Sequence, residues 1–66
     1  MIYRFDIARS DAGVEQLERY LPDDSTAVEW MGSEFLAVGD RMEAYRGDET
    51  TPFARREHSG DVQVLR

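Results

Sequence analysis

The sequence predicts an α+β fold in which one helix packs on one face of a largely antiparallel sheet. Three observations predict it. Apolar and polar residues alternate near the N-terminus, a capping residue and an apolar stripe with helical spacing follow, and three central segments of alternating apolar residues are joined by two glycine turns. In chain order the expected elements are β-α-β-β-β, then a short helix or strand, then a final β. With 66 residues, the chain is expected to form a single domain over residues 1–66.

The first strand and the helix follow from residues 2–8 and 10–20. In the first segment apolar side chains alternate with polar ones, which is the period of a half-buried strand: Tyr3, Phe5 and Ile7. Ser10 or Asp11 can then cap a helix that continues to about Tyr20. Its expected apolar stripe recurs at i, i+3 and i+7 and consists of Val14, Leu17 and Leu21. Pro22 would end this helix, because the residue before a proline disfavours helical geometry.

Residues 26–31, 34–38 and 41–46 are expected to form a three-stranded meander. Gly32 and Gly39 each begin a two-residue turn, where a positive φ suits glycine. In this register one face is wholly apolar and should pack on the helix: Val28, Trp30, Phe35, Ala37, Met42 and Ala44. The other face should meet solvent with acidic, apolar and aromatic side chains: Glu29, Met31, Glu34, Leu36, Val38, Arg41, Glu43 and Tyr45.

The last third of the chain allows two interpretations. Thr51-Pro52 resembles a helix start, and Gly60 could end a short helix. Residues 53–58 could equally form a strand that pairs with residues 62–65. We favour a short helical turn for residues 51–59 and expect the final strand at residues 62–65, where Val62, Val64 and Leu65 are apolar.

Composition excludes several classes of function. Fourteen acidic residues against eight arginines give a formal net charge of −6, which argues against direct nucleic-acid binding and against adsorption to anionic membranes. The absence of cysteine excludes disulfides and thiolate metal sites. The single histidine, His58, lacks neighbours in a ligand or acid–base pattern. We therefore expect a cytoplasmic protein that is not an enzyme and has no catalytic residues, metal site or cofactor.

The negative charge is concentrated in the middle of the chain. Residues 23–49 carry eight acids and two arginines, so this segment alone has a formal charge of −6. An acidic surface with apolar and aromatic anchors suits a basic partner, because charge steers the encounter and apolar contacts hold the complex. The expected partner-binding residues are Asp23, Asp24, Glu29, Glu34, Leu36, Glu43, Tyr45, Asp48 and Glu49.

In its size, acidity, lack of cysteine and acidic stretch over residues 23–49, the chain resembles small phage-encoded inhibitors such as anti-CRISPR proteins and other DNA mimics. The resemblance is to the class and involves no shared motif, so no residue role is transferred. It implies binding to a basic, nucleic-acid-binding partner of a host defence system, in the host cell cytoplasm, with its nucleic-acid site blocked.

The alternative is a small housekeeping homodimer or complex subunit. Its acidity would then reflect genome composition or a saline habitat, in keeping with basic residues that are all arginine. A domain of this length gains stability from oligomerisation. An edge strand, the first or the last, could pair with a second copy across a two-fold axis.

Overall fold

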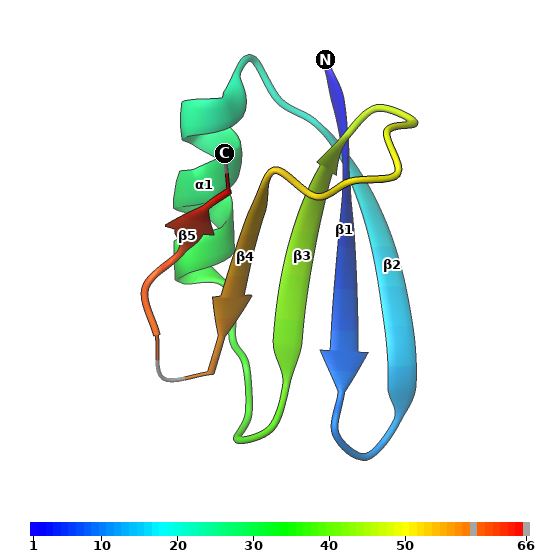
Figure 1. The fold of residues 1–66 in the computed structure, drawn as a ribbon, viewed down its shortest axis with the longest axis vertical. Coiled ribbons are helices and arrows are strands. Elements are labelled where there is room, and N and C mark those ends of the chain that lie inside the picture. The colour runs from blue at the N-terminus through cyan, green and yellow to red at the C-terminus, as the bar shows by residue number, and fades with distance from the viewer. Residues whose placement is uncertain (59, 66) are drawn as a thin grey trace.

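The sheet and the helix form two layers. The structure, a computed structural model, describes residues 1–58 and 60–65, which form five strands and one helix: β1 (Ile2–Arg9), β2 (Gly13–Tyr20), α1 (Asp24–Ser33), β3 (Arg41–Arg46), β4 (Ala54–Glu57) and β5 (Gln63–Val64). All neighbouring strands are antiparallel, in the order β2-β1-β3-β4-β5. Helix α1 lies behind the sheet in Figure 1, and the face toward the viewer carries no helix. The predicted α+β class is confirmed.

The core lies between α1 and the central strands. Tyr3, Phe5 and Ile7 of β1 are fully buried, as the alternation predicts. The register places Phe5 beside Ala44 and Ile7 beside Met42, so β1 and β3 present their buried side chains to the same face. The helix contributes Ala27, Met31 and the partly buried Trp30, whose ring centroid lies 4.4 Å from that of Phe5.

The expected helix over residues 10–20 is wrong, because this segment is the edge strand β2. All eight of its residues pair with β1, from Ile2 opposite Tyr20 to Arg9 opposite Gly13. Gly13 has a φ of 78°, a left-handed conformation that allows the tight return of the chain after β1. Pairing with a buried strand outweighs the weak helical pattern, since strand preference depends strongly on context.

The expected strand over residues 26–31 is also wrong, because these residues lie in α1. Asp23 is the N-cap: its Oδ1 accepts hydrogen bonds from the backbone N–H and the hydroxyl of Thr26 at 2.9 and 2.8 Å. Ala27 and Met31 are spaced by four residues and both point into the core, which is a helical and not a strand period. The predicted chain order β-α-β-β-β therefore becomes β-β-α-β-β-β.

Of the remaining secondary-structure predictions, some are confirmed and others are wrong. Residues 34–38 form no strand, so the three-stranded meander does not exist, whereas residues 41–46 are β3 as expected. Within residues 51–59 the favoured helical turn is wrong, since Ala54–Glu57 is strand β4; position 59 lies outside the described residues. The final strand is confirmed over a shorter length, as β5.

A buried carboxylate fixes the loop between α1 and β3. Asp40, only 3% exposed, accepts hydrogen bonds from the backbone N–H groups of Ser10 at 3.0 Å and Ala37 at 2.9 Å. The Arg9 guanidinium lies 3.1 Å from the same carboxylate. These contacts lower the pKa of Asp40 to about 2, chiefly because the two backbone N–H groups favour the charged form. Asp40 thus fastens the loop to the end of β1.

The C-terminal end of α1 is held by an arginine from the sheet. The Nη1 of Arg56 donates to the backbone carbonyls of Met31 at 2.7 Å and Glu34 at 2.6 Å. The last carbonyls of a helix lack partners within it, so a cation at this end is favourable. Arg56 therefore connects β4 to the helix.

We expect Arg56→Met to lower the free energy of unfolding by about 1–3 kcal/mol, because it leaves these carbonyls without a charged donor. Urea denaturation measures the loss. The neighbouring Arg55→Met is the matched control. Arg55 is exposed, and among the described residues its guanidinium bonds only the side chain of Gln63, at 3.3 Å, so its effect should stay within about 0.5 kcal/mol. Equal losses for the two variants would contradict this role of Arg56.

Candidate functional site

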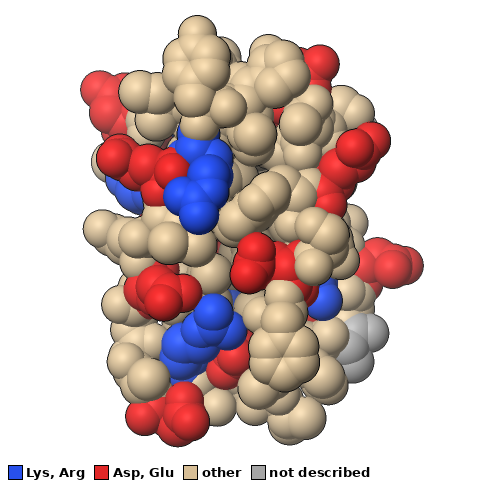
Figure 2. Space-filling model, turned by 180° about the vertical axis from the view of Figure 1, so that it is seen from behind, with Lys and Arg blue, Asp and Glu red and all other residues tan. Residues whose placement is uncertain are grey.

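The expected acidic face is dispersed over the molecule. Glu29 lies on the exposed side of α1, and Glu34 is its C-cap residue. Glu43 lies on β3 and, being opposite Asp6, faces the side of the sheet away from the helix. Figure 2, which views the helix side, shows acidic side chains spread along the surface with arginines between them. The three glutamates do not form the common patch that the sequence predicts.

The two expected anchors are not free surface residues. Leu36 is 2% exposed and belongs to the hydrophobic core. Tyr45 is 9% exposed, and the guanidinium carbon of Arg4 lies 4.1 Å from the centre of its ring. Burial, followed by the negative charge of Glu43, raises the pKa of Tyr45. Neither side chain offers a partner much accessible apolar surface.

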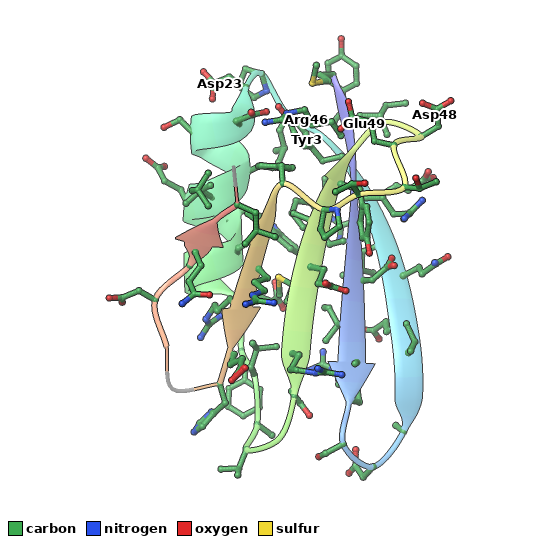
Figure 3. All side chains as sticks on the ribbon, in the orientation of Figure 1. Tyr3, Asp23, Arg46, Asp48 and Glu49 are labelled. Carbon is green, nitrogen blue, oxygen red and sulfur yellow. The ribbon has the colours of Figure 1, made fainter. Side chains whose placement is uncertain are left out.

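Four expected site residues lie at the same end of the molecule, with Asp23 on one side of Arg46 and Asp48 and Glu49 on the other (Figure 3). We call this surface, formed by Asp23, Asp24, Asp48 and Glu49, the acidic end (Figure 3). The first two begin α1, and the last two lie in the loop between β3 and β4. The structure brings these segments together although more than twenty residues separate them in the chain. The acidic end is therefore a product of the tertiary fold.

One arginine joins the two halves of the acidic end. Arg46, the last residue of β3, donates through Nε and Nη2 to Oδ2 of Asp24 at 2.9 and 2.7 Å. Its Nη1 lies 3.7 Å from Oε1 of Glu49. The four acidic side chains and Arg46 together carry a formal charge of −3, and the ammonium of Met1, which donates to the carbonyl of Leu21, lies at the same end of the molecule (Figure 1). The internal ion pairs therefore neutralise only part of its negative charge.

A buried tyrosine holds the Asp24 carboxylate in place. The hydroxyl of Tyr3 donates to Oδ1 of Asp24 at 2.7 Å, while Arg46 occupies the other oxygen. Burial, followed by this hydrogen bond, raises the pKa of Tyr3 to about 12. The bonds from Arg46 and Tyr3 lower the pKa of Asp24. Asp24 is thus an ordered, ionised group at the root of the acidic end.

Exposed apolar side chains lie beside the loop that carries Asp48 and Glu49. Ile2 and Tyr20 are direct partners across β1 and β2 and are 50% and 80% exposed. The backbone N–H of Gly47 donates to the carbonyl of Ile2 at 2.8 Å, which places the acidic loop next to this pair. Sequence reasoning missed the pair because it depends on residues 13–20 being a strand. The one local signal was Gly13 inside the expected helix.

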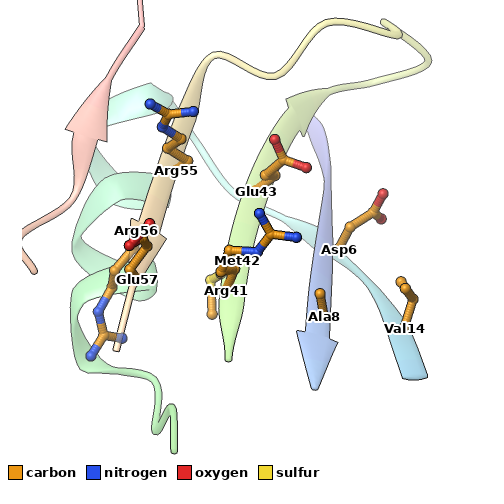
Figure 4. Close-up of a pocket in the computed structure, with 9 residues that line it drawn as sticks. All are labelled: Asp6, Ala8, Val14, Arg41, Met42, Glu43, Arg55, Arg56 and Glu57. Carbon is orange, nitrogen blue, oxygen red and sulfur yellow. The ribbon is translucent and has the colours of Figure 1, made fainter. Parts of the chain in front are cut away.

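The uncovered face of the sheet has a shallow hollow of about 280 Å³. Figure 4 shows Asp6 and Glu43 side by side on β1 and β3, with Arg41 and Arg55 near them. Three acidic and three basic residues line the hollow, so it has no excess charge: Asp6, Glu43, Glu57, Arg41, Arg55 and Arg56. It offers neither the strong negative field nor the apolar depth that would identify a class of ligand.

Within residues 1–58 and 60–65, no group of three or more His, Cys, Asp or Glu residues could hold a metal ion. The ring Nδ1 of His58 lies 2.8 Å from the backbone carbonyl of Leu36, which gives this histidine a local structural contact. The helix in the described residues lacks the length and apolarity needed to cross a membrane.

Comparison with protein-family models, with curated proteins and with solved structures finds no significant match to this chain.

Proposed function

We propose that this protein is a non-enzymatic inhibitor or interaction protein whose acidic end binds a basic, nucleic-acid-binding partner and blocks its nucleic-acid site. The observation that carries the proposal is the formal side-chain charge of −3 at the acidic end, next to the exposed Ile2–Tyr20 pair. The proposal includes a cytoplasmic location and no cofactor.

The chemistry of the partner follows from this arrangement. A surface that binds nucleic acid presents lysine and arginine side chains to phosphates. Carboxylates can take the place of phosphates for such cations, and a concentrated negative field raises the rate of encounter. Affinity also needs apolar contacts that become buried, and Ile2 and Tyr20 offer such surface. Binding at the acidic end would therefore compete with nucleic acid for the partner.

The other acidic residues of the expected site are proposed to contribute less to partner binding than the acidic end. Glu29, Glu34 and Glu43 contribute to the overall negative field from separate parts of the surface. Long-range attraction depends on the summed charge, which these residues increase, while close contact depends on the acidic end. We therefore expect single changes at these glutamates to affect binding less than changes at Asp48 and Glu49.

We expect the double variant Asp48→Arg/Glu49→Arg to weaken partner binding by about tenfold or more, because it reverses the charge in the loop of the acidic end. Both residues are exposed, so the fold should remain intact. The measurement is capture from a cell lysate on the immobilised protein, with captured proteins identified by mass spectrometry. A nucleic-acid-binding protein that is released by added DNA, or by salt, is the expected result.

The matched control is Asp11→Arg/Asp61→Arg. These exposed acids lie in the connections between β1 and β2 and between β4 and β5, outside the acidic end, and the variant has the same total charge as the first. It should retain the captured partner. If both double variants lose the partner equally, overall charge is responsible and the acidic end is not the binding site. If neither loses it, the proposed site is wrong.

A further inference from the structure

The outer edge of β2 is open along its whole length. β2 is the first strand in the sheet order, and in the described residues it pairs only with β1. It is eight residues long, and all of these except the half-buried Leu17 are exposed. A long open edge is a template for a further strand, and proteins commonly shorten or cover such edges.

The hydrogen bonds at the end of the hairpin show which backbone groups point outward. Met1 and Leu21 exchange two bonds: the Leu21 N–H donates to the Met1 carbonyl at 2.9 Å, and the Met1 ammonium donates to the Leu21 carbonyl at 3.1 Å. Bonded and non-bonded pairs alternate along an antiparallel ladder, so every second residue of β2 points its N–H and C=O away from β1. These residues are Val14, Gln16, Glu18 and Tyr20.

We propose that β2 pairs antiparallel with β2 of a second copy of this chain, across a two-fold axis that passes beside Leu17. In this register Val14 lies opposite Tyr20 of the second copy, and Gln16 lies opposite Glu18. These are the residues whose backbone groups point outward, so each such pair can exchange two backbone hydrogen bonds. Every outward-pointing residue of β2 finds a partner.

The side chains in this register are self-complementary. Glu15 lies opposite Arg19 of the second copy, and the symmetry produces this contact twice. Leu17 lies opposite itself, on the face where it already packs against the core. These are non-bonded pairs of the ladder, in which opposing side chains approach most closely. Val14 and Tyr20, 67% and 80% exposed, would cover each other on the open face.

Neighbouring registers lack this complementarity. A two-fold axis perpendicular to the sheet keeps the core-facing sides of the two copies on the same side of the joined sheet. Each alternative register therefore places the axis beside a different residue of β2. Centred on Gln16, the pairing places Glu15 opposite Leu17 and Val14 opposite Glu18. Centred on Glu18, it places two glutamates directly opposite each other, which is destabilising. The charge pattern of β2 therefore selects the register centred on Leu17.

In the single copy, arginines hold the groups that pairing would use. Arg19 donates through Nη1 to the carbonyl of its neighbour Glu18 at 2.8 Å, which is one of the outward acceptors. Glu15 accepts from Arg9 at 3.2 Å. On pairing, the Glu18 carbonyl would accept a backbone N–H from the second copy, and Arg19 would turn to Glu15 across the interface. The exchange replaces exposed side-chain bonds with a continuous ladder.

A charge swap tests the register. The dissociation constant of the dimer is measured by analytical ultracentrifugation over a range of protein concentrations. Glu15→Arg and Arg19→Glu should each weaken the dimer by about tenfold, since each places like charges opposite one another twice. The double variant Glu15→Arg/Arg19→Glu should recover the dimer. Loss of an intramolecular contact alone would not be repaired by the swap, so a double variant as weak as the singles would overturn the register.

A proline variant tests the edge itself. Gln16→Pro removes an outward N–H but no bond to β1, and proline is tolerated on edge strands with this orientation. It should leave the circular dichroism spectrum unchanged and weaken the dimer by more than tenfold, whereas Gln16→Ala should keep it. A wild-type protein that stays monomeric at all concentrations would overturn the proposal. Because β2 is not changed in Asp48→Arg/Glu49→Arg, that variant should dimerise normally, which separates this proposal from the proposed function.

Discussion

Phe5→Ala is expected to remove a large part or all of the stability of this protein. Phe5 is fully buried in the middle of β1, and its ring packs on Trp30 of the helix with 4.4 Å between the ring centroids. Replacing a buried phenylalanine with alanine costs about 3–5 kcal/mol, through lost burial and the cavity that remains. A domain of this length has a total stability of only about 3–10 kcal/mol. Thermal unfolding followed by circular dichroism measures the effect.

Phe35→Ala is the matched control for this prediction. It removes the same number of atoms, but Phe35 lies in the loop after α1 and is 76% exposed. The change in unfolding free energy should therefore stay within about 0.5 kcal/mol. The pair also distinguishes two folds, because the three-stranded meander predicted from sequence would bury Phe35 against Trp30. Large losses in both variants would contradict the core described here.

Asp40→Ala is expected to cause the second large loss of stability. The substitution leaves two backbone N–H groups, of Ser10 and Ala37, without their acceptor, and removes one of the acidic partners of Arg9. Bonds to a charged acceptor are among the stronger ones, and the carboxylate that accepts these is itself only 3% exposed. We expect the melting temperature to fall by more than about 10 °C. Asp61→Ala, an exposed acid in the loop before β5, should change it little.

The pH dependence of stability should show the contribution of the Asp40 carboxylate. The pKa of Asp40 falls from 3.8 to about 2 on folding, so the folded state favours the ionised carboxylate. Its contribution is complete above the unfolded pKa and is lost as the pH falls from about 4 to about 2. Acid denaturation curves of the wild type and Asp40→Ala should therefore converge across this window. Curves that remain parallel down to pH 2 would show that Asp40 stabilises the fold by another route.

The accuracy of the sequence prediction followed the burial of each segment. β1 and β3 lie inside the sheet and bury one face each, so their alternation of apolar and polar residues is visible in the sequence. β2 lies at the edge with a single half-buried residue, so it has no such alternation to detect. Its spacing of Val14, Leu17 and Leu21 matched a helix by chance. In α1, Gly32 and Gly39 were interpreted as hairpin turns, so residues 26–31 were assigned to a strand and the N-cap at Asp23 was missed.

The candidate site shows the same division. The sequence alone determined the net charge of −6 and its concentration in residues 23–49. It could not determine which of these acids are neighbours, because that depends on contacts between distant segments. Only the tertiary structure placed Asp24 and Glu49 on either side of Arg46, set the Ile2–Tyr20 pair beside them, and dispersed the three glutamates.

The sequence by itself determined the composition of this protein, its α+β class and the strands that bury a regular apolar face. The tertiary structure alone decided which face carries the helix, which edge of the sheet is open and where the carboxylates gather. The physical reason is one of range. Local patterning records the burial of each segment, whereas strand pairing and charge clustering arise between residues that are close only after the chain has folded.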